Sequence, residues 1–381
     1  MNGSIPVPTT DVSMEIPVSG GVPTVAIGRP FLPRAERPIG FYDMTLSEVE
    51  DRLRGMKQAD YRATQLYEWA YRGLVDEYAA MTNLPAALRA TLADQLPLSL
   101  LTPVREVSAD AGETVKTLYR TADGQLIETV LMFYPDRVTV CVSCQVGCAV
   151  GCAFCATGLG GLTRNLSAGE MVAQVVGAAR KARELGRTLT NIVMMGMGEP
   201  LQNYAATMKM VGILHDSRGL NLGARRITVS TSGVVPRIVA LGAEPYHVNL
   251  AVSLHAPNDA LRNTMVPLNR RYPIDALLNA CRGYIQATGR RVSFEYALMR
   301  GINDSDATAR ELGALLRGIL CHVNVIPLNP VDVLPYDRPD RDGIERFSDI
   351  VRRAGIPTTV RYSRGVDIGA ACGQLRASAD E

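Results

Sequence analysis

The chain has 381 residues and a mass of 41.2 kDa, enough for two or three domains, although an α/β barrel of this size often forms one unit. Hydrophobic residues make up 47% and charged residues 20% of it, a globular composition that excludes a wholly disordered or collagen-like chain. Forty basic and 38 acidic residues leave a net charge of +2, so any contact with RNA has to come from local clusters.

The first segment, residues 1–38, is rich in Pro, Gly, Val, Ser and Thr and shows no sustained period, which predicts a flexible extension. It lacks a basic stretch followed by an apolar run. No run of about 18 uncharged apolar residues occurs elsewhere in the chain. We therefore expect a cytoplasmic protein that does not contact a membrane.

Residues 39–102 predict a small helical domain. The run TLSEVEDRLRGM, from Thr45, offers Thr or Ser as an N-cap, and apolar residues recur near helical spacing in YRATQLYEWAYRGL and LPAALRATLADQL. The following region, 103–136, contains TVKTLYRTADGQLIETVLMFY. This run predicts two strands around an Asp123-Gly124 turn, and therefore a β-hairpin that links the helical domain to the rest.

From residue 137 to 377, short β-rich apolar runs alternate with helical segments. Strands are expected at 138–143, 191–196, 226–232, 248–255, 292–298, 323–329 and 358–363, and helices at 167–186, 203–217, 273–287 and 305–318. This alternation predicts an α/β fold with a parallel sheet covered by helices, as a full or partial (βα) barrel. Its chemistry would lie at the C-terminal ends of the strands.

Eight cysteines stand at positions 141, 144, 148, 152, 155, 281, 321 and 372, five of them within fifteen residues. In a long chain without a secretion signal, this clustering favours metal or redox chemistry over a disulfide framework. Cys281 lies in a helical stretch and Cys321 begins a strand, positions typical of buried structural thiols.

The strongest motif is Cys148-Ala-Val-Gly-Cys152-Ala-Phe-Cys155, between a predicted strand and a predicted helix. Three thiolates in one short loop can bind three irons of a [4Fe-4S] cluster and leave the fourth iron open to a ligand. A structural zinc site normally uses four ligands in two spaced pairs. Cys141 or Cys144 would then have to supply the fourth ligand.

The C-x3-C-x2-C spacing, with an aromatic residue before the last Cys, resembles the radical S-adenosylmethionine superfamily. This resemblance implies that S-adenosylmethionine chelates the open iron and that an electron from the cluster splits it into methionine and a 5'-deoxyadenosyl radical. The segment MGMGEP, 195–200, resembles the superfamily's cofactor segment. There Gly198 would allow close backbone approach, and Glu199 would accept a hydrogen bond from the methionine ammonium.

A narrower resemblance covers nearly everything from about residue 40 to 377. It rests on CVSCQVGC, FCATG, GGLTRNL, NIVMMGMGEPLQNY, ITVSTSGVVP, LAVSLHAPND, VNVIPLNP and AACGQLR, in this order. Together they resemble the dual-specificity rRNA and tRNA adenine C2-methyltransferase family, to which the C8-methylating antibiotic-resistance enzymes are related. The helical N-terminal domain is similar to that family's RNA-binding accessory domain.

The resemblance implies the substrates and the cofactors. The substrates would be adenines in the peptidyl transferase centre of 23S rRNA and next to the anticodon of tRNA. One [4Fe-4S] cluster and two S-adenosylmethionine molecules would serve each turnover, together with a reducing electron donor such as flavodoxin. Two alternatives stay open: C8 methylation of adenine, and a non-catalytic RNA-binding protein with a structural or redox-sensing metal site.

The resemblance also implies three catalytic roles outside the cluster. Cys372 would take a methyl group as a thiolate nucleophile, and the methylene radical formed from it would add to the base. Cys141 would attack the Cys372 sulfur, release the methylated base and leave a Cys141–Cys372 disulfide. Glu128 would be the general base that removes the C2 proton. From the residues alone, Cys372 reads as an exposed tail thiol and Glu128 as the solvent face of a strand.

Cofactor contacts are implied for Gly198, Glu199, Ser230, Ser253, His255 and Asn329. Cys144 departs from the family pattern, in which a small hydroxylated residue is usual, and could compete with Cys141 or with a cluster ligand. Local basic spots occur at Arg164, Arg225-Arg226, Arg270-Arg271 and Arg290-Arg291. They would either hold RNA phosphates or be solvated loop charges.

Overall fold

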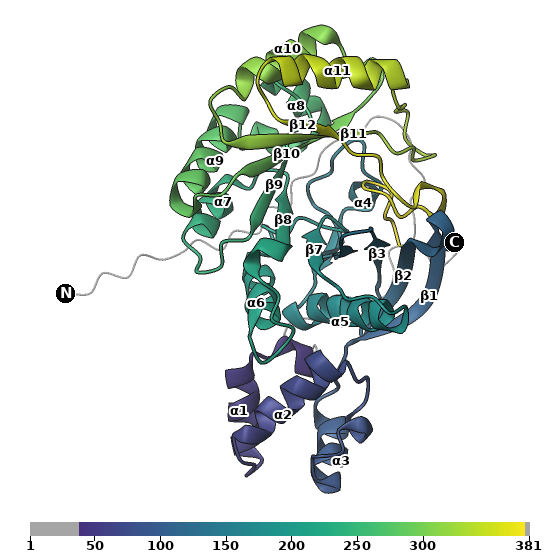
Figure 1. Cartoon of the computed structure of the whole chain (residues 1–381), viewed down its shortest axis with the longest axis vertical. Helices are drawn as coiled ribbons and strands as arrows, with labels where there is room; N and C mark the ends of the chain where they lie inside the picture. The colour runs from purple at the N-terminus through teal and green to yellow at the C-terminus, as the bar shows by residue number, and fades with distance from the viewer. Residues whose placement is uncertain (1–37, 378–381) are drawn as a thin grey trace, which may run out of the picture. The chain divides into compact units, whose positions relative to one another are not determined.

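The structure, a computed structural model, describes residues 38–377, so the extension expected over 1–38 lies outside the described residues except for its last position. A ten-stranded sheet in the order β1-β2-β3-β4-β7-β8-β9-β10-β11-β12 forms its centre (Figure 1). No strand pairing joins the two ends of this sheet within 38–377, so the barrel is partial.

The strands from β4 to β12 are parallel. Their bounds are β4 (Val138–Cys141), β7 (Asn191–Met194), β8 (Ile227–Thr231), β9 (Asn249–Ser253), β10 (Val292–Leu298), β11 (Cys321–Pro327) and β12 (Thr358–Val360). All the strands expected in this half of the chain are present. They can be read from sequence because helices cover the sheet, which makes each strand a nearly continuous apolar run.

An antiparallel extension precedes the parallel strands. The expected hairpin consists of β2 (Thr114–Thr121) and β3 (Leu126–Phe133), and β3 pairs with β4. A further strand, β1 (Leu101–Ala109), was not expected. It is an edge strand with a run of exposed residues, so it lacks the apolar alternation by which a half-buried strand is recognised.

Helices cover the outer side of the parallel strands (Figure 1). They are α5 (Ala168–Glu184), α6 (Tyr204–His215), α7 (Val235–Gly242), α8 (Asp259–Met265), α9 (Ile274–Thr288), α10 (Asp306–Leu315) and α11 (Arg341–Arg353). The expected helices correspond to α5, α6, α9 and α10. The other three helices are not among those expected from the sequence. The helices α7 and α8 are too short to show a clear period, whereas α11 does have apolar residues at helical spacing.

The N-terminal helices are η2 (Phe41–Asp43), α1 (Leu46–Gly55), α2 (Tyr61–Tyr67), η3 (Glu68–Gly73), η4 (Tyr78–Ala80) and α3 (Ala86–Gln95). They pack against α5, where Asp43 Oδ1 accepts a hydrogen bond from Gly169 N at 2.7 Å. A Cβ atom at Gly169 would lie 2.6 Å from the Asp43 carboxylate, so this contact requires glycine. The boundaries between extension, helical domain, hairpin and barrel stay predictions.

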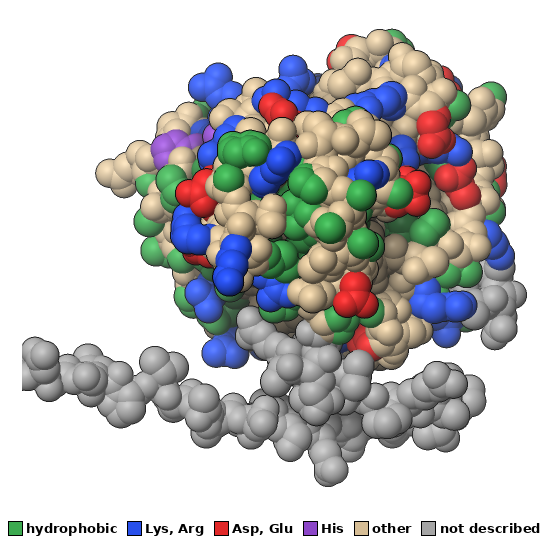
Figure 2. Space-filling model, turned by 90° about the horizontal axis from the view of Figure 1, so that it is seen from below, with side chains coloured by type: hydrophobic (Ala, Val, Ile, Leu, Met, Phe, Trp, Pro, Cys, Tyr) green, Lys and Arg blue, Asp and Glu red, His purple; other side chains and the backbone are tan. Residues whose placement is uncertain are grey.

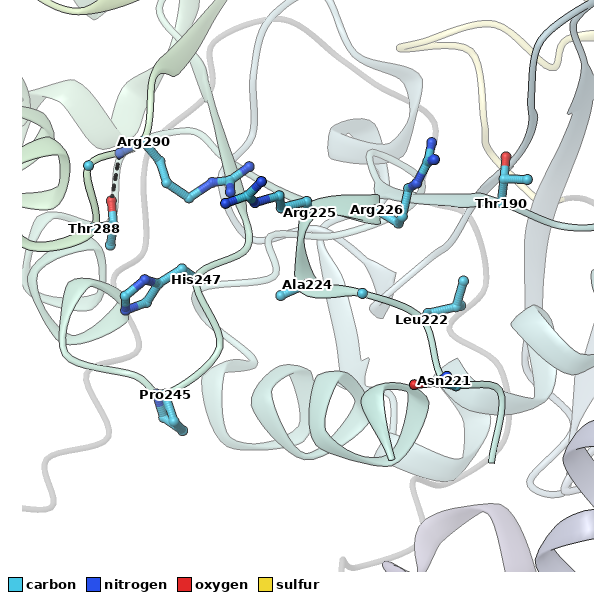
Figure 3. Close-up of a pocket in the computed structure, with 12 residues that line it drawn as sticks. Thr190, Asn221, Leu222, Ala224, Arg225, Arg226, Pro245, His247, Thr288 and Arg290 are labelled. Carbon is cyan, nitrogen blue, oxygen red and sulfur yellow. Dashed lines mark hydrogen bonds between the residues drawn. The ribbon is translucent and has the colours of Figure 1, made fainter. Parts of the chain in front are cut away.

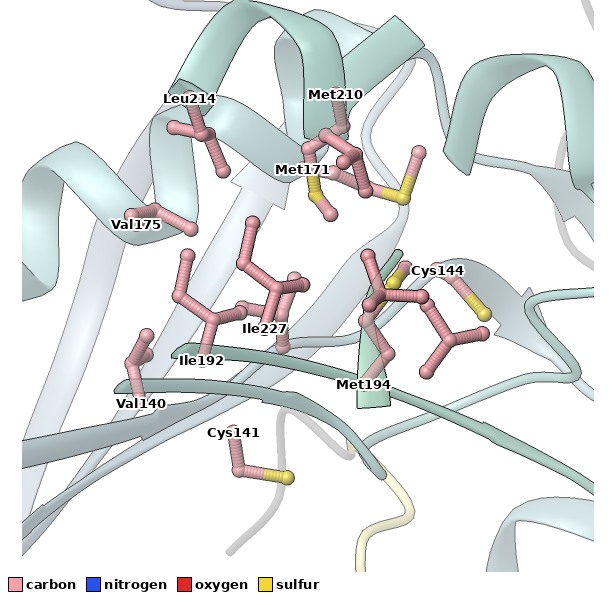
Figure 4. Close-up of a cluster of buried hydrophobic side chains, with 14 of the residues drawn as sticks. Val140, Cys141, Cys144, Met171, Val175, Ile192, Met194, Met210, Leu214 and Ile227 are labelled. Atoms are coloured by element: carbon pink, nitrogen blue, oxygen red, sulfur yellow. The ribbon is translucent and has the colours of Figure 1, made fainter. Parts of the chain in front are cut away.

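One hydrophobic core runs between the sheet and its helices. In Figure 4, Val140, Ile192 and Ile227 of neighbouring strands point toward side chains of α5 and α6. The surface is mixed: Figure 2 shows basic and acidic side chains interspersed on one face, in agreement with the small net charge. No helix within 38–377 is long and apolar enough to cross a membrane.

Candidate active site

A cavity of about 160 Å³ lies at the C-terminal ends of the parallel strands, where a (βα) barrel carries its chemistry. It collects the predicted residues from distant parts of the chain. Among its lining residues are Cys148, Cys152, Cys155, Gly198, Glu199, Ser230, Ser253, His255, Asn329 and Cys372. Of the predicted site residues, only Cys141 and Glu128 do not line it.

The cysteine loop lies between two short antiparallel strands, β5 (Gln145–Gly147) and β6 (Leu162–Asn165). The helix α4 (Ala156–Leu159) follows the last Cys. Gly147 has φ +76°, and a Cβ atom there would lie 2.0 Å from Gly161 O. Only glycine fits this position. The Cys148 backbone N then donates to Gly161 O at 2.8 Å, which fixes where the loop begins.

Burial makes these thiols poor acids on their own. It raises the pKa of Cys148 to about 11 and that of Cys152 well above its usual value, and repulsion between neighbouring thiolates adds to both shifts. Cationic iron would favour the thiolate form. Within 38–377 no three His, Cys, Asp or Glu side chains converge on a position for one metal ion. In a [4Fe-4S] cluster, each of the three thiolates would bind a different iron.

Gly198 and Glu199 follow β7. Gly198 has φ +106°, and a Cβ atom there would lie 2.5 Å from Gln145 Cβ. The buried Glu199 carboxylate accepts hydrogen bonds from Ser232 N and Ser232 Oγ, each at 2.7 Å. Burial raises the pKa of Glu199, and these hydrogen bonds from Ser232 oppose the shift. The result is a fixed hydrogen-bond acceptor beside the cysteine loop.

His255 is neutral in the cavity wall. Its Nδ1 accepts a hydrogen bond from Ala297 N at 2.9 Å, which places the ring proton on Nε2. Burial, together with the charge of Arg262, lowers the pKa of His255 to about 3. The ring also packs edge-on against Phe154 of the cysteine loop, with 4.8 Å between centroids.

Cys372 is held against the cysteine loop by its backbone neighbours. Ala156 N of α4 donates to Gly373 O at 2.7 Å, and Thr157 Oγ1 donates to Leu375 O at 2.6 Å. Asn329 Nδ2 donates to Cys372 O at 3.0 Å, so this predicted cofactor residue also positions the thiol. The reading of Cys372 as an exposed tail thiol is therefore wrong.

Cys372 also lines a second, smaller cavity, together with Cys141 and Arg361. Burial and the neighbouring Cys372 raise the pKa of Cys141 to about 12, whereas Arg361 lowers it. Burial raises the pKa of Cys372, and Arg361 again acts in the opposite direction. All eight cysteines are free thiols. Cys372 therefore borders both the cysteine-loop cavity and the smaller cavity that Cys141 lines.

Cys144 takes a different direction from Cys141. Figure 4 shows the Cys141 side chain on the opposite side of β4 from Val140, whereas Cys144 lies near Met194. Cys144 is buried and lines neither cavity; a Cβ atom at Gly198 would lie 2.9 Å from its sulfur. This position favours a packed thiol over a competitor for Cys141.

Glu128 lies outside both cavities. It is buried, so its reading as the solvent face of a strand is wrong. Lys116 Nζ lies 2.9 Å from Glu128 Oε1. Glu128 Oε2 accepts hydrogen bonds from Arg376 N at 2.9 Å and from Ala377 N at 3.0 Å. The carboxylate thus holds the end of the described chain and does not face Cys372.

Sequence reasoning missed two charged residues at the site. Glu295 of β10 lines the main cavity, and its Oε1 accepts from Asn324 Nδ2 at 2.9 Å. Its buried Oε2 has no hydrogen-bond partner in the part of the chain that the structure describes. The signal was present as a lone carboxylate in the apolar run VSFEYAL. Arg361, just after β12, gave no such signal, because its partners come from other strands.

Comparison with known proteins identifies the family. Residues 142–312 match the model of the radical SAM superfamily, and residues 39–97 match that of the ribosomal RNA large subunit methyltransferase N-terminal domain. The chain is 48% identical to the probable dual-specificity RNA methyltransferase RlmN of Roseiflexus sp. (strain RS-1), with 88% of this chain and 95% of the relative covered. The chain belongs to the RlmN family. The RlmN of Alkaliphilus oremlandii (strain OhILAs) is 46% identical, with 89% and 97% covered.

A solved structure agrees with this membership. The crystal structure of a radical SAM methyltransferase from Sphaerobacter thermophilus matches with a TM-score of 0.89 and 69% identity, covering 90% of this chain and 100% of that one. The radical SAM fold and the RlmN resemblance are thus confirmed. As a member of this family the chain is an enzyme that uses a [4Fe-4S] cluster and S-adenosylmethionine. The alternative of a non-catalytic RNA-binding protein is wrong.

Proposed function

We propose that this chain methylates C2 of adenine in 23S rRNA and in tRNA next to the anticodon, with Cys372 as the methyl carrier. Its RlmN relatives are dual-specificity RNA methyltransferases. The observation that carries the assignment is the position of Cys372, which lines both the cavity of the cysteine loop and the cavity of Cys141. A methyl carrier needs access to both.

The cofactors have matching residues in the main cavity. Cys148, Cys152 and Cys155 would hold the [4Fe-4S] cluster, and the cofactor contacts would come from Gly198, Glu199, Ser230, Ser253, His255 and Asn329. When bound, the cluster and S-adenosylmethionine supply a carbon-centred radical. The Glu199 carboxylate would accept a hydrogen bond from the methionine ammonium, and the neutral His255 would offer an Nε2–H donor without adding charge.

Two thiols with different tasks explain the second cavity. Adenine C2 lies between two ring nitrogens and is too electron-poor to attack a sulfonium methyl, so the carbon passes through Cys372. Release then requires Cys141: its thiolate attacks the Cys372 sulfur and an S–S bond forms. The S–C bond breaks with its electron pair on the carbon attached to the base, and this carbon takes up a proton to become the methyl group. Arg361 favours the thiolate of both cysteines. The resulting disulfide must be reduced before the next turnover.

Glu128 acts as the proton acceptor after a rearrangement. Its Oε1 is paired with Lys116 and its Oε2 accepts from Arg376 N and Ala377 N, so these contacts have to rearrange before the carboxylate can receive the C2 proton. The helical segment 39–102 contributes to RNA binding in this proposal, and a reducing protein such as flavodoxin supplies the electron. The cytoplasmic location stays a prediction.

One experiment tests the proposed function. The protein is reconstituted anaerobically with iron and sulfide and is assayed on unmodified 23S rRNA and tRNA with S-adenosylmethionine and reductant. We expect 2-methyladenosine in the digested RNA. If only 8-methyladenosine forms, the enzyme methylates C8 of adenine and the proposed C2 specificity is wrong. An intact cluster that yields neither nucleoside would overturn the proposal.

A further inference from the structure

A second cleft lies at the other end of the parallel strands. It has a volume of about 770 Å³ and is formed by the segments that precede β7, β8, β9 and β10 (Figure 3). It is lined by Thr190, Asn221, Leu222, Gly223, Ala224, Arg225, Arg226, Pro245, His247, Thr288, Gly289 and Arg290. The length of β10 separates it from the main cavity by about 20 Å. It is therefore distinct from the proposed active site.

The cleft is basic without acidic partners. Arg225, Arg226 and Arg290 line it together with His247, and no Asp or Glu of the described part of the chain does. Within residues 38–377, none of these arginines forms an ion pair. In Figure 3 the side chains of Arg225 and Arg290 extend toward one another. Two like charges that face the same space are favourable only when an anion lies between them or water screens them.

The arginines are held in place by neutral groups. Arg290 Nη2 donates to Asn249 Oδ1, and Asn249 Nδ2 in turn donates to Arg225 O at 2.8 Å. Arg290 N donates to Thr288 Oγ1 at 3.2 Å, the dashed contact of Figure 3. Among residues 38–377, Arg290 Nε is buried and finds no hydrogen-bond partner. A buried donor without an acceptor is costly, and a shift of the Arg290 side chain toward an oxyanion in the cleft would satisfy it.

Favourable interactions with helix ends explain the position of only some of these arginines. The C-terminal end of α9 lies next to Arg290, and a cation is favourable there. Arg225 and Arg226, however, belong to η6 (Ala224–Arg226), a separate turn well beyond the end of α6 at His215. Their convergence with Arg290 is therefore not explained by the ends of the neighbouring helices.

We propose that this cleft binds backbone phosphates of the RNA substrate at a distance from the target adenine. The inference rests on the proposed function as an RNA methyltransferase. Guanidinium groups bind phosphate oxygens in a bidentate manner, and a chain of net charge +2 must hold RNA through such local clusters. Because about 20 Å separates the cleft from the main cavity, only an RNA that extends well beyond its target loop can reach both.

The test compares a double variant with a matched control. Arg225→Gln/Arg226→Gln removes two charges from the cleft and leaves Arg290 in place. Arg353→Gln/Arg317→Gln removes two exposed charges elsewhere. The dissociation constants of full-length unmodified tRNA and of its isolated anticodon stem-loop are measured as a function of KCl concentration, and thermal unfolding shows that both variants fold.

We expect the cleft variant to bind full-length tRNA at least tenfold more weakly and the slope of log Kd against log salt to fall by about 1 to 2. Stem-loop affinity should change no more than in the control.

Equal losses in both variants, or an equal loss for both RNAs, would overturn the site. The site would also be overturned if the cleft variant bound RNA unchanged but its cluster were reduced more slowly by flavodoxin. The cleft would then be a protein-binding site. If the protein does not methylate RNA but the cleft variant shows the expected fall in salt slope, the proposed function is overturned and the cleft remains an RNA-binding site.

Discussion

Lys116 and Glu128 form a buried ion pair, with 2.9 Å between Lys116 Nζ and Glu128 Oε1, at the point where the chain returns from the active site. The two residues lie on the paired strands β2 and β3. Each also lies beside the segment that carries Cys372: Glu128 binds the backbone of Arg376 and Ala377, and a Cβ atom at Gly369 would lie 3.4 Å from Lys116 Nζ. The pair therefore contacts the chain both before Cys372, at Gly369, and after it, at Arg376 and Ala377.

Glu128→Gln should loosen this segment. The variant leaves a buried ammonium without its counter-charge, which costs about 3 kcal/mol or more. We expect a lower unfolding temperature and faster hydrogen exchange at the amides of Arg376 and Ala377. Lys116→Met combined with Glu128→Gln should recover part of the unfolding temperature. Unchanged exchange at both amides in the single variant would show that the carboxylate does not hold the chain end.

Cys372→Ala should abolish methylation of both RNAs and leave the cluster in place. The reason is that Cys372 lines the main cavity without being one of the three loop cysteines. Iron content and the visible spectrum report the cluster, and nucleoside analysis reports the product. Cys281→Ala, which removes a fully buried thiol from α9, is the control for loss of a cysteine. Turnover above background in Cys372→Ala would exclude the carrier role.

Cys141→Ala should trap the RNA on the protein. Without the thiol that shares a cavity with Cys372, the bond between the Cys372 carbon and the base cannot be resolved. We expect a protein–RNA adduct that survives denaturing electrophoresis. Cys144→Ser is the matched control, because Cys144 lines neither cavity, and it should give no adduct. Adduct formation in the Cys144 variant instead would exchange the roles of the two cysteines.

Arg361→Gln should slow the loading of Cys372 with a methyl group at neutral pH. The guanidinium lowers the pKa of Cys372 and of Cys141, so its removal raises both and reduces the thiolate fraction. Mass spectrometry of the peptide that contains Cys372 measures loading between pH 6 and about 9. The profile of the variant should move toward higher pH, and Arg353→Gln should leave it in place. A parallel, pH-independent drop would indicate misfolding of the site.

His255 should make the stability of the protein depend on acid pH. Its pKa is about 3 in the folded chain and 6.5 without the surrounding structure, so unfolding takes up a proton below about pH 6.5. The contribution is fully present above that pH and is lost as the pH falls toward 3. Urea unfolding of the apoprotein at several pH values measures it. His255→Gln should flatten the dependence between pH 6 and about 4; an unchanged slope would contradict the neutral, buried imidazole.

The parts of the site that depend on local chemistry can be predicted from the order of the amino acids alone. Cys148, Cys152 and Cys155 share one loop whose spacing is set by the covalent chain, and Gly198 allows close backbone approach because it has no Cβ. The alternation of apolar strands and amphipathic helices likewise predicts a full or partial (βα) barrel, since buried parallel strands have a recognisable composition. These features need no knowledge of distant contacts.

Which distant side chains meet becomes known only from the folded chain. The side-chain period of a strand is two, so the register of β4 alone sets the face on which Cys141 lies, opposite Val140. Cys144, three residues later, points elsewhere, and sequence spacing cannot separate the two. In the same way, Glu128 looks solvent-facing until β2 brings Lys116 beside it and the chain end covers it. Such relationships arise from long-range packing, which local propensity does not encode.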